Sequence, residues 1–341
     1  MTGKNIKYYR LLQNMSLQDL ADQVGLKKMA ISNYENGKRE PNYEICQKIA
    51  DALGISLAML ISKYGNNLSI QHGAFRKKAR LSNVKIELIY GQEDRFLGRL
   101  FNIVSFLGDA SLAPCPIIST VEVTNTEDAG QHLRQLLGLP ASGPVGNITD
   151  ILENKGFIVC PIDVLKEDFS GNNGYVNGRP YIAVNTHMSA ERQRFTLIHE
   201  LAHLVFAFPE GQNEEHMVDE IAGAFLLPKE DIIRELGPKR HSIRGDLRII
   251  QQEYNISMAS IVMRARQADI ITQQTYIITM KWMSASGLRK DEHSGIAAEK
   301  THLLEQLTLR AVAEEQIGIS KAAEILEMPL LETRRLCFGG I

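Results

Sequence analysis

The sequence has little cysteine and no long apolar run. Its 341 residues include four cysteines, which lie far apart and form no C-x-x-C pair. This spacing argues against a disulfide framework and against a thiolate metal site. No apolar stretch approaches the ~20 residues that a membrane-spanning helix needs, and the polar segment 1–10 lacks the apolar core of a signal peptide. These absences predict a cytoplasmic protein without a membrane partner.

The charge is unevenly distributed along the chain. Residues 1–85 carry 14 Lys or Arg against 6 Asp or Glu, although the net charge of the whole chain is -2. The N-terminal quarter therefore suits a polyanion. Six of these cations fall between residues 63 and 85 with no acid among them, and they form either a phosphate-contacting arm or a solvated linker. The length and the 44% apolar content predict two or three packed domains.

Residues 6–61 have apolar residues at helical spacing, in short blocks separated by glycine, asparagine and proline. This pattern predicts five short helices. Ser16 is placed to cap the second helix, and Gly25 ends it. The third helix, 27–36, directs lysine and small polar side chains outward. Two helices joined by a tight glycine turn are what a helix-turn-helix needs to enter the major groove of DNA.

This segment resembles the Cro and lambda-repressor (XRE) type of helix-turn-helix domain. The residues that carry the resemblance are Leu20, Ala21, Gly25, Ile31, Ser32, Tyr34, Glu35, Gly37, Pro41, Ile49, Ala50, Leu53, Gly54 and Ile55. The resemblance implies an operator-type DNA duplex as partner and a homodimer, because such domains commonly bind palindromic sites. The alternative is a helical domain that has lost DNA binding and serves as a platform for dimerisation or for a partner.

The same resemblance assigns roles on the third helix. It implies that Lys28, Met29 and Asn33 read bases, and that Lys38 and Arg39 contact phosphates. The full predicted DNA-binding set is Lys27, Lys28, Met29, Ser32, Asn33, Lys38 and Arg39.

A second motif, H-E-x-x-H, lies at His199, Glu200 and His203. On a helix, this spacing places both imidazoles on one face, where they can share a zinc ion. The carboxylate of Glu200 then reaches a metal-bound water and acts as the general base. Most flanking residues are apolar, and two buried histidines beside a buried glutamate are costly without a partner such as a metal. The alternative is a satisfied polar cluster in a helical core.

A catalytic zinc keeps three protein ligands and one open position, so the third ligand must come from downstream. The next predicted helix begins near Asn213 and ends at Pro228. Its candidate ligands are Glu214, Glu215, His216, Asp219 and Glu220. Helical geometry extends the packed face to Glu215 and Glu214, whereas Glu220 points away.

The blocks 192–203 and 215–228 together resemble the ImmA/IrrE family of zinc metallopeptidases. The resemblance implies a zincin-like (gluzincin) domain and places the third zinc ligand at Glu215, with Glu214 as the fallback. Val218 and Asp219 stand where many relatives have Ala-Asn.

The resemblance also covers the lead-in from about residue 129 to residue 187. Within it, 180–185 is predicted to be an edge strand that holds an extended substrate peptide by main-chain pairing.

The predicted fold class is therefore α+β multidomain. The domains are an all-α helix-turn-helix domain (1–65), a helical connector (66–128), a zincin-like metallopeptidase domain (129–270) and a mixed α/β C-terminal region (271–341) that serves packing or regulation. In the last region, 275–282 is predicted to be a strand and 301–323 to be helical.

Taken with this resemblance, the leading hypothesis is a zinc endopeptidase that cleaves a cognate repressor or antitoxin. Such cleavage controls transcription in a stress, phage or mobile-element circuit. An alternative is a non-proteolytic transcriptional regulator or toxin–antitoxin component, whose zinc domain binds or senses a partner. A third reading is a structural zinc, which needs four protein ligands and no open position.

Overall fold

The structure is a computed structural model that describes residues 2–62, 68–73, 81–164 and 169–339. The chain forms two compact units. Unit 1 comprises residues 1–112, 176–178 and 302–341, and unit 2 comprises residues 113–175 and 179–301. Among the described residues, no helix is both long and apolar enough to cross a membrane. Of the cationic run, Lys63, Arg76, Lys77, Lys78 and Arg80 lie outside the described residues.

Unit 1 begins with the five predicted helices. They are α1 (Thr2–Leu12), α2 (Leu17–Val24), α3 (Lys28–Glu35), α4 (Tyr43–Ala52) and α5 (Leu57–Ile61). Ser16 caps α2 as predicted, because its side chain accepts from the amide of Asp19 and the Asp19 side chain accepts in return from the amide of Ser16. Gly25 ends α2 with a φ of 69°, a left-handed conformation that suits glycine.

A buried ion pair fixes α3 against α1. The Nε and a terminal nitrogen of Arg10 contact the two carboxylate oxygens of Glu35 at 2.6 and 2.8 Å. The other terminal nitrogen donates to the carbonyl of Met15 at 2.7 Å. This fork geometry satisfies both charges inside the domain. It therefore fixes the orientation of the helix that carries most of the predicted DNA-binding residues.

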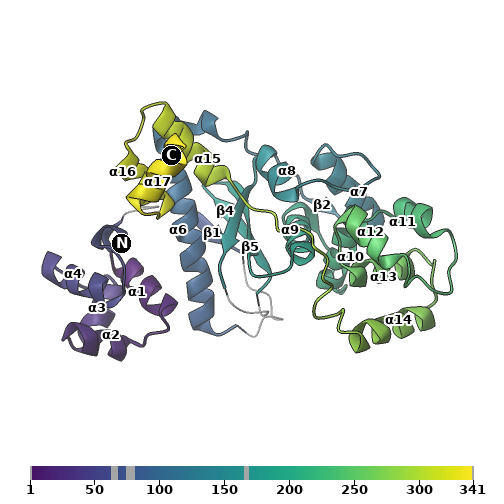
Figure 1. Ribbon diagram of the computed structural model, residues 1–341, viewed down its shortest axis with the longest axis horizontal. Helices are drawn as coiled ribbons and strands as arrows, with labels where there is room; N and C mark the ends of the chain where they lie inside the picture. Colours follow the sequence, from purple (N-terminus) through teal and green to yellow (C-terminus); the bar gives the residue numbers. More distant parts are fainter. Residues whose placement is uncertain (1, 63–67, 74–80, 165–168, 340–341) are drawn as a thin grey trace. The chain divides into compact units, whose positions relative to one another are not determined.

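The remaining elements of unit 1 come from later in the chain. They are β1 (Ile70–His72), α6 (Asn83–Leu107), η1 (Asp109–Ser111), α15 (Leu303–Ala313), α16 (Ile319–Leu326) and α17 (Leu330–Phe338). Helix α6 packs against α1, α15 and α16 (Figure 1). The segment 301–323, predicted to be helical, holds two helices, because the chain turns at Glu315 with a left-handed φ of 57°.

Unit 2 is a mixed helical and stranded body. Its elements are β2 (Val121–Glu122), α7 (Thr126–Leu136), α8 (Ile148–Asn154), β3 (Ile158–Ile162), β4 (Gly171–Val176, of which Val176 belongs to unit 1), β5 (Arg179–Asn185), α9 (Ala190–Val205), β6 (Phe206–Ala207), α10 (Glu214–Leu226), α11 (Lys229–Leu236), α12 (Leu247–Tyr254), α13 (Met258–Gln267) and α14 (Gln273–Ala285). The α+β multidomain class is thus confirmed.

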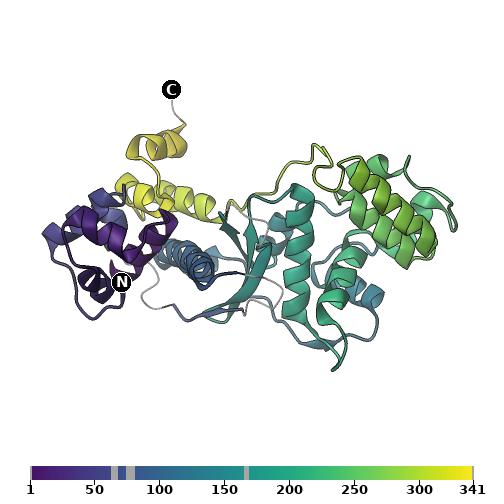
Figure 2. The same ribbon diagram turned by 90° about the horizontal axis from the view of Figure 1, so that it is seen from below.

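The sheet corrects one prediction about β5. Strand β5 lies between β4 and β3, and it pairs in parallel with β3 from Tyr181 opposite Ile158 to Asn185 opposite Ile162. The predicted edge strand at 180–185 is therefore wrong, because both of its sides are already paired. Its continuous apolar run, 181–184, is buried within the sheet, where α9 packs against it (Figure 2).

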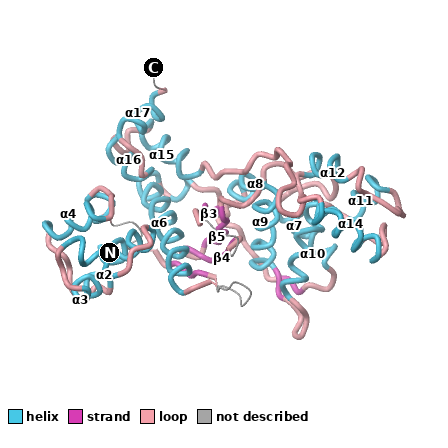
Figure 3. Tube along the Cα trace, turned by 60° about the horizontal axis from the view of Figure 1, so that its bottom comes forward, coloured by secondary structure: helices cyan, strands magenta, loops and turns pink. Residues whose placement is uncertain are grey.

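The predicted strand at 275–282 is also wrong, because these residues lie in α14. Thr272 caps this helix, since its side chain accepts from the amide of Thr275 at 3.2 Å. Thr279 and Met283 are four residues apart and are both buried. The β-branched and aromatic residues favour a strand locally, but the cap and the packing against α13 prevail. The described residues after 271 form helices and loops only (Figure 3).

Two buried arginines hold the C-terminal end of α10. The Nε of Arg134 donates to the carbonyl of Phe225 at 2.7 Å, and the Nε of Arg264 donates to the carbonyl of Leu227 at 2.8 Å. Carbonyls at a helix end lack partners within the helix, so these bonds satisfy them inside the core. Near the same end, α7 packs closely on α10, because a Cβ on Gly130 would lie 2.8 Å from the Cβ of Ala224.

A titratable cluster in unit 1 predicts a pH dependence of stability. His72 contacts Glu93 through Nδ1 at 2.5 Å and Asp94 through Nε2 at 3.1 Å. Burial lowers the pKa of His72, but the bonds to Asp94 and Glu93 outweigh burial and raise the pKa to about 9. A histidine with a raised pKa stabilises the folded state fully below its unfolded pKa of about 6.5. This stabilisation is lost as the pH rises through about 9.

We therefore expect the free energy of unfolding of the wild type to fall by about 1–3 kcal/mol more than that of His72→Gln between mildly acidic and strongly alkaline pH. Urea unfolding followed by circular dichroism at each pH measures the difference. His241→Gln, at an exposed histidine, is the control and should follow the wild type. Parallel pH profiles for wild type and His72→Gln would contradict this assignment.

Candidate metal centre and nucleic-acid interface

Helix α9 brings the H-E-x-x-H residues into one place. It begins after Ser189, whose side chain accepts from the amide of Arg192, and it runs for 16 residues. Because His199 and His203 are separated by four positions, their side chains lie on one face of α9. The two Nε2 atoms lie 3.2 Å apart.

Glu215, in the first turn of α10, completes the group. Its Oε2 lies 3.8 Å from Nε2 of His199, and its Oε1 lies 3.7 Å from Nε2 of His203. Within the described parts of the chain, no other set of three His, Cys, Asp or Glu side chains brings its ligand atoms this close together. Helix α10 begins after Asn213 as predicted, since the Asn213 side chain accepts from the amide of His216.

The donor set fits a small four-coordinate metal ion. Tetrahedral zinc with bonds of ~2.0 to 2.1 Å needs donor atoms roughly 3.3 Å apart. The three measured separations of 3.2, 3.7 and 3.8 Å lie close to this value. Two imidazoles and one carboxylate also match the ligand types of catalytic zinc, which leave a fourth position for water or substrate.

The outer nitrogens of both histidines meet carboxylates. Nδ1 of His199 lies 2.9 Å from Oδ1 of Asp219, and Nδ1 of His203 lies 3.3 Å from Oε1 of Glu214. A carboxylate at Nδ1 favours a proton there, which leaves the Nε2 lone pair directed at the shared point. Glu214 therefore lies on the outer side of His203, whereas Glu215 faces both Nε2 atoms.

Asp219, one of the candidate ligands, contacts the outer nitrogen of His199 instead of the shared point, and Asn173 is a contact to the motif that the sequence did not indicate. Asp219 follows Glu215 by four positions, so helical spacing alone places it on the same face of α10. No comparable signal marks Asn173, because it comes from β4, which is distant in sequence. Glu220 lies away from the group as predicted, accepting instead from Thr126 at 3.1 Å.

The carboxylate of Glu200 is held from the sheet side of α9. The Nδ2 of Asn173 donates to Oε2 of Glu200 at 2.7 Å, and Glu200 is 8% exposed. Strand β4 approaches α9 closely at Gly171, where a Cβ would lie 2.4 Å from Cγ2 of Thr196 and 3.2 Å from Cγ of Glu200. Glycine at this position thus allows Asn173 to reach Glu200.

A hollow of about 360 Å³ borders this group on the α10 and α13 side. Asp219, which contacts His199, lines it, and so does Phe195, whose ring lies 6.3 Å from that of His199. Met263, Tyr276 and other apolar groups make up part of the wall, and arginines make up another part. The hollow is therefore suited to an amphipathic side chain.

The predicted DNA-binding residues gather on and after α3. Lys27 precedes the helix in an extended conformation, Lys28 is exposed, and Met29 is 69% exposed. Ser32 and Asn33 are half-buried, and the carbonyl of Asn33 accepts from the amide of Lys38 at 2.9 Å. Lys38 and Arg39 are exposed in the turn that follows. Ile31 and Tyr34 are buried on the opposite face. This is the presentation that a recognition helix requires.

Together, these two sites define a chain that joins a helix-turn-helix domain to a domain with a histidine–carboxylate cluster. A sequence model described as helix-turn-helix matches residues 6–60, and a peptidase-family model described as the IrrE N-terminal-like domain matches residues 159–266. The chain therefore combines a helix-turn-helix domain with an IrrE-like peptidase-family domain.

Curated relatives match over short stretches. The HTH-type transcriptional regulator YqaE of Bacillus subtilis is 32% identical over 22% of this chain and 64% of its own length. The HTH-type transcriptional regulator MJ0272 of Methanocaldococcus jannaschii is 36% identical over 15% of this chain and 79% of its own length. Multiprotein-bridging factor 1 of Saccharomyces cerevisiae is 33% identical over 22% of this chain and 46% of its own length. The chain thus spans less than two thirds of the length of YqaE and of the yeast protein.

The contact at Gly171 generates a prediction about stability. Gly171→Ala places a methyl group 2.8 Å from the backbone oxygen of Ala183 as well as against Thr196, so the strand must shift. We expect a loss of about 1–3 kcal/mol in the free energy of unfolding, as is typical of overpacked cores. Urea unfolding monitors the loss. Gly245→Ala meets no heavy atom within 4 Å and serves as the matched control; equal stability of the two variants would contradict the close approach.

Proposed function

We propose that the chain is a zinc-dependent, site-specific endopeptidase that works in the cytoplasm and carries its own DNA-binding domain. The observation that carries the proposal is the convergence of Nε2 of His199, Nε2 of His203 and the carboxylate of Glu215 on one point. Membership of a peptidase family supports the same class of activity.

His199, His203 and Glu215 are the residues that would hold zinc. When bound, zinc lowers the pKa of a water to ~7 and polarises the scissile carbonyl. Glu200 acts as the general base: its carboxylate takes a proton from the attacking water and later gives one to the leaving amine. The Asn173 amide keeps the Glu200 carboxylate in position. Asp219 holds a proton at Nδ1 of His199. The Glu214 carboxylate lies 3.3 Å from Nδ1 of His203.

We infer that the substrate is a repressor or antitoxin with an exposed loop that lies extended beside α9. The hollow next to His199 would accept one side chain of that loop, and its mixed wall selects a residue with both apolar and charged parts. A cytoplasmic peptidase needs a narrow substrate range, because a broadly active one would also cut the other proteins there. Cleavage would remove a repressor or antitoxin in a stress, phage or mobile-element circuit.

The DNA-binding half supports localisation to an operator. In this proposal Lys28, Met29 and Asn33 read base edges, while Lys38 and Arg39 contact phosphates. Lys27 is adjacent to Lys28 in the sequence, and Ser32 is adjacent to Asn33. A homodimer would place two such helices on a palindromic site.

A second candidate function is a non-proteolytic regulator. The complete helix-turn-helix domain favours it, as do relatives that are named as transcriptional regulators. In that case the zinc domain would bind or sense a partner without cleaving it.

Glu200→Gln separates the two functions. The substitution leaves His199, His203 and Glu215 in place, so we expect the purified variant to retain zinc in metal analysis. Loss of the general base should slow cleavage by about 10²–10⁴-fold. Mass spectrometry of new protein N-termini, in cells that produce either form, measures cleavage of the unidentified substrate.

The matched control is Glu210→Gln, at an exposed glutamate of unit 2, which should cleave like the wild type. If Glu200→Gln produced the same new N-termini as the wild type, the peptidase proposal would fail. If no form produced any, the non-proteolytic regulator would be favoured.

DNA binding is tested on α3. Lys28→Ala with Asn33→Ala removes two base-reading side chains, each worth about 1–3 kcal/mol of discrimination. We expect at least a tenfold loss of affinity for the DNA upstream of the chain's own gene, measured by fluorescence anisotropy at fixed salt. Lys48→Ala removes an exposed cation of α4 that pairs with Glu44, and it should bind normally. Unchanged binding by the double variant would favour the partner-platform alternative.

A further inference from the structure

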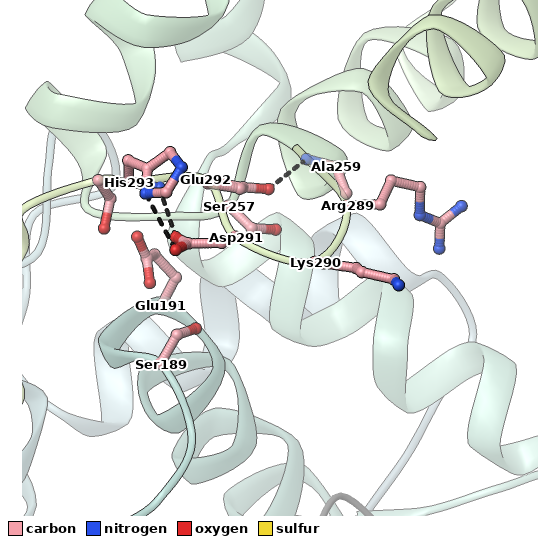
Figure 4. A pocket seen from close by; sticks show the side chains of 10 residues that line it. Ser189, Glu191, Ser257, Ala259, Arg289, Lys290, Asp291, Glu292 and His293 are labelled. Atoms are coloured by element: carbon pink, nitrogen blue, oxygen red, sulfur yellow. Dashed lines mark hydrogen bonds and ion pairs between the residues drawn. The ribbon is translucent and has the colours of Figure 1, made fainter. Parts of the chain in front are cut away.

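A second hollow, of about 230 Å³, lies beside the first turn of α9. A cavity of roughly 150 Å³ already holds a benzene molecule, so this one has room for a small organic ligand. It is lined by Ser189, Glu191, Ser257, Ala259, Arg289, Lys290, Asp291, Glu292, His293 and Ser294 (Figure 4). All of these residues belong to unit 2, and none is part of the metal centre.

One oxygen of a buried carboxylate that lines this hollow has no hydrogen-bond partner among the described residues. Glu191 is 4% exposed, and its Oε1 has no hydrogen-bond donor among the described residues. Figure 4 shows its carboxylate near that of Asp291, whereas the Glu292 carboxylate is directed toward Ala259. Burying a charged carboxylate without compensation is costly, so a donor is expected at this position. Glu292, by contrast, accepts from the amide of Met258 at 2.8 Å.

The charges around the hollow are separated. The carboxylates of Glu191, Asp291 and Glu292 gather at one end, whereas the charged ends of Arg289 and Lys290 point away from them (Figure 4). His293 also faces this end, where its Nδ1 lies 2.9 Å from Asp291. Burial raises the pKa of Glu292, and the negative charge of Glu191 adds to the rise. A positive group at this end would relieve that repulsion.

The spacing of the acids favours an organic cation over a metal ion. These side chains do not bring three ligand atoms within 4.8 Å of one another, as His199, His203 and Glu215 do in the described chain. An ammonium or guanidinium group carries several donors that spread over separate acceptors. The hydroxyls of Ser189, Ser257 and Ser294 add further acceptors around the hollow.

We propose that this hollow binds a small organic cation, whose ammonium or guanidinium group donates to Oε1 of Glu191. The occupant would contact both α9 and the 289–294 loop. Glu191 precedes His199 by eight residues, which is about 12 Å along the helix. The loop continues to Glu299, which forms a buried ion pair with Arg194 of α9. Binding at this site is independent of zinc and of peptidase activity.

Titration calorimetry on the full chain tests the proposal, with agmatine and putrescine as probes. We expect a saturable heat for at least one of them, and a rise in the melting temperature of the wild type at millimolar probe. Glu191→Gln keeps the shape of the side chain but removes its charge, and it should weaken binding about tenfold or more. Without probe, this variant should melt no lower than the wild type, because it lacks the uncompensated buried charge.

Two further variants serve as controls. Glu230→Gln, at an exposed glutamate of α11, should bind like the wild type. Lys290→Gln removes an exposed positive charge from the rim and should tighten binding of either probe, and it carries little risk to folding. No saturable heat with either probe, equal binding by Glu191→Gln, or an equal response to sodium or magnesium chloride would each overturn the proposal.

Discussion

Helix α9 buries polar side chains inside an apolar core, and unit 2 supplies partners to Gln193, Arg194 and Glu200 among them. The guanidinium of Arg194 donates to the carbonyls of Val145, Gly146 and Asn255, and it pairs with Glu299. Because these partners come from three separate parts of the chain, satisfying one arginine also fixes the loops around α9. Further along α9, the two histidines of the motif are partly buried polar groups, and carboxylates of α10 lie beside them.

The position of α10 depends on its close approach to the backbone of α7. Gly130 and Ala224 let α7 and α10 pack with little space between them, and Gly223 lets Arg264 pass. The buried guanidinium groups of Arg134 and Arg264 then satisfy carbonyls at the end of α10. The outcome is a rigid α10 whose first turn places Glu215 opposite both histidines, so the cluster depends on residues far from it.

Local rules predicted those parts of the molecule that depend on neighbouring residues. Capping by Ser16, the start of α10 after Asn213 and the shared face of the two histidines all follow from spacing within one helix. Predictions that needed long-range pairing failed or were absent. Strand β5 became central because β4 covers its other side, and Asn173 reaches the motif only through that same strand. The prediction for 275–282 gave more weight to the β-branched residues than to the helix cap, whereas these residues form a helix in the structure.

Unit 1 is built from segments far apart in the chain, which affects the order in which it can fold during synthesis. The helix-turn-helix core uses residues from Ile6 to Leu60 only, so it can form early during synthesis. Helix α6, however, is covered by α15 and α16, which lie near the end of the chain. The part of the α6 surface that α15 and α16 cover therefore stays exposed until the ribosome has released residues 302–341, after all of unit 2 has emerged. A chain cut short by premature termination would leave this surface exposed to solvent.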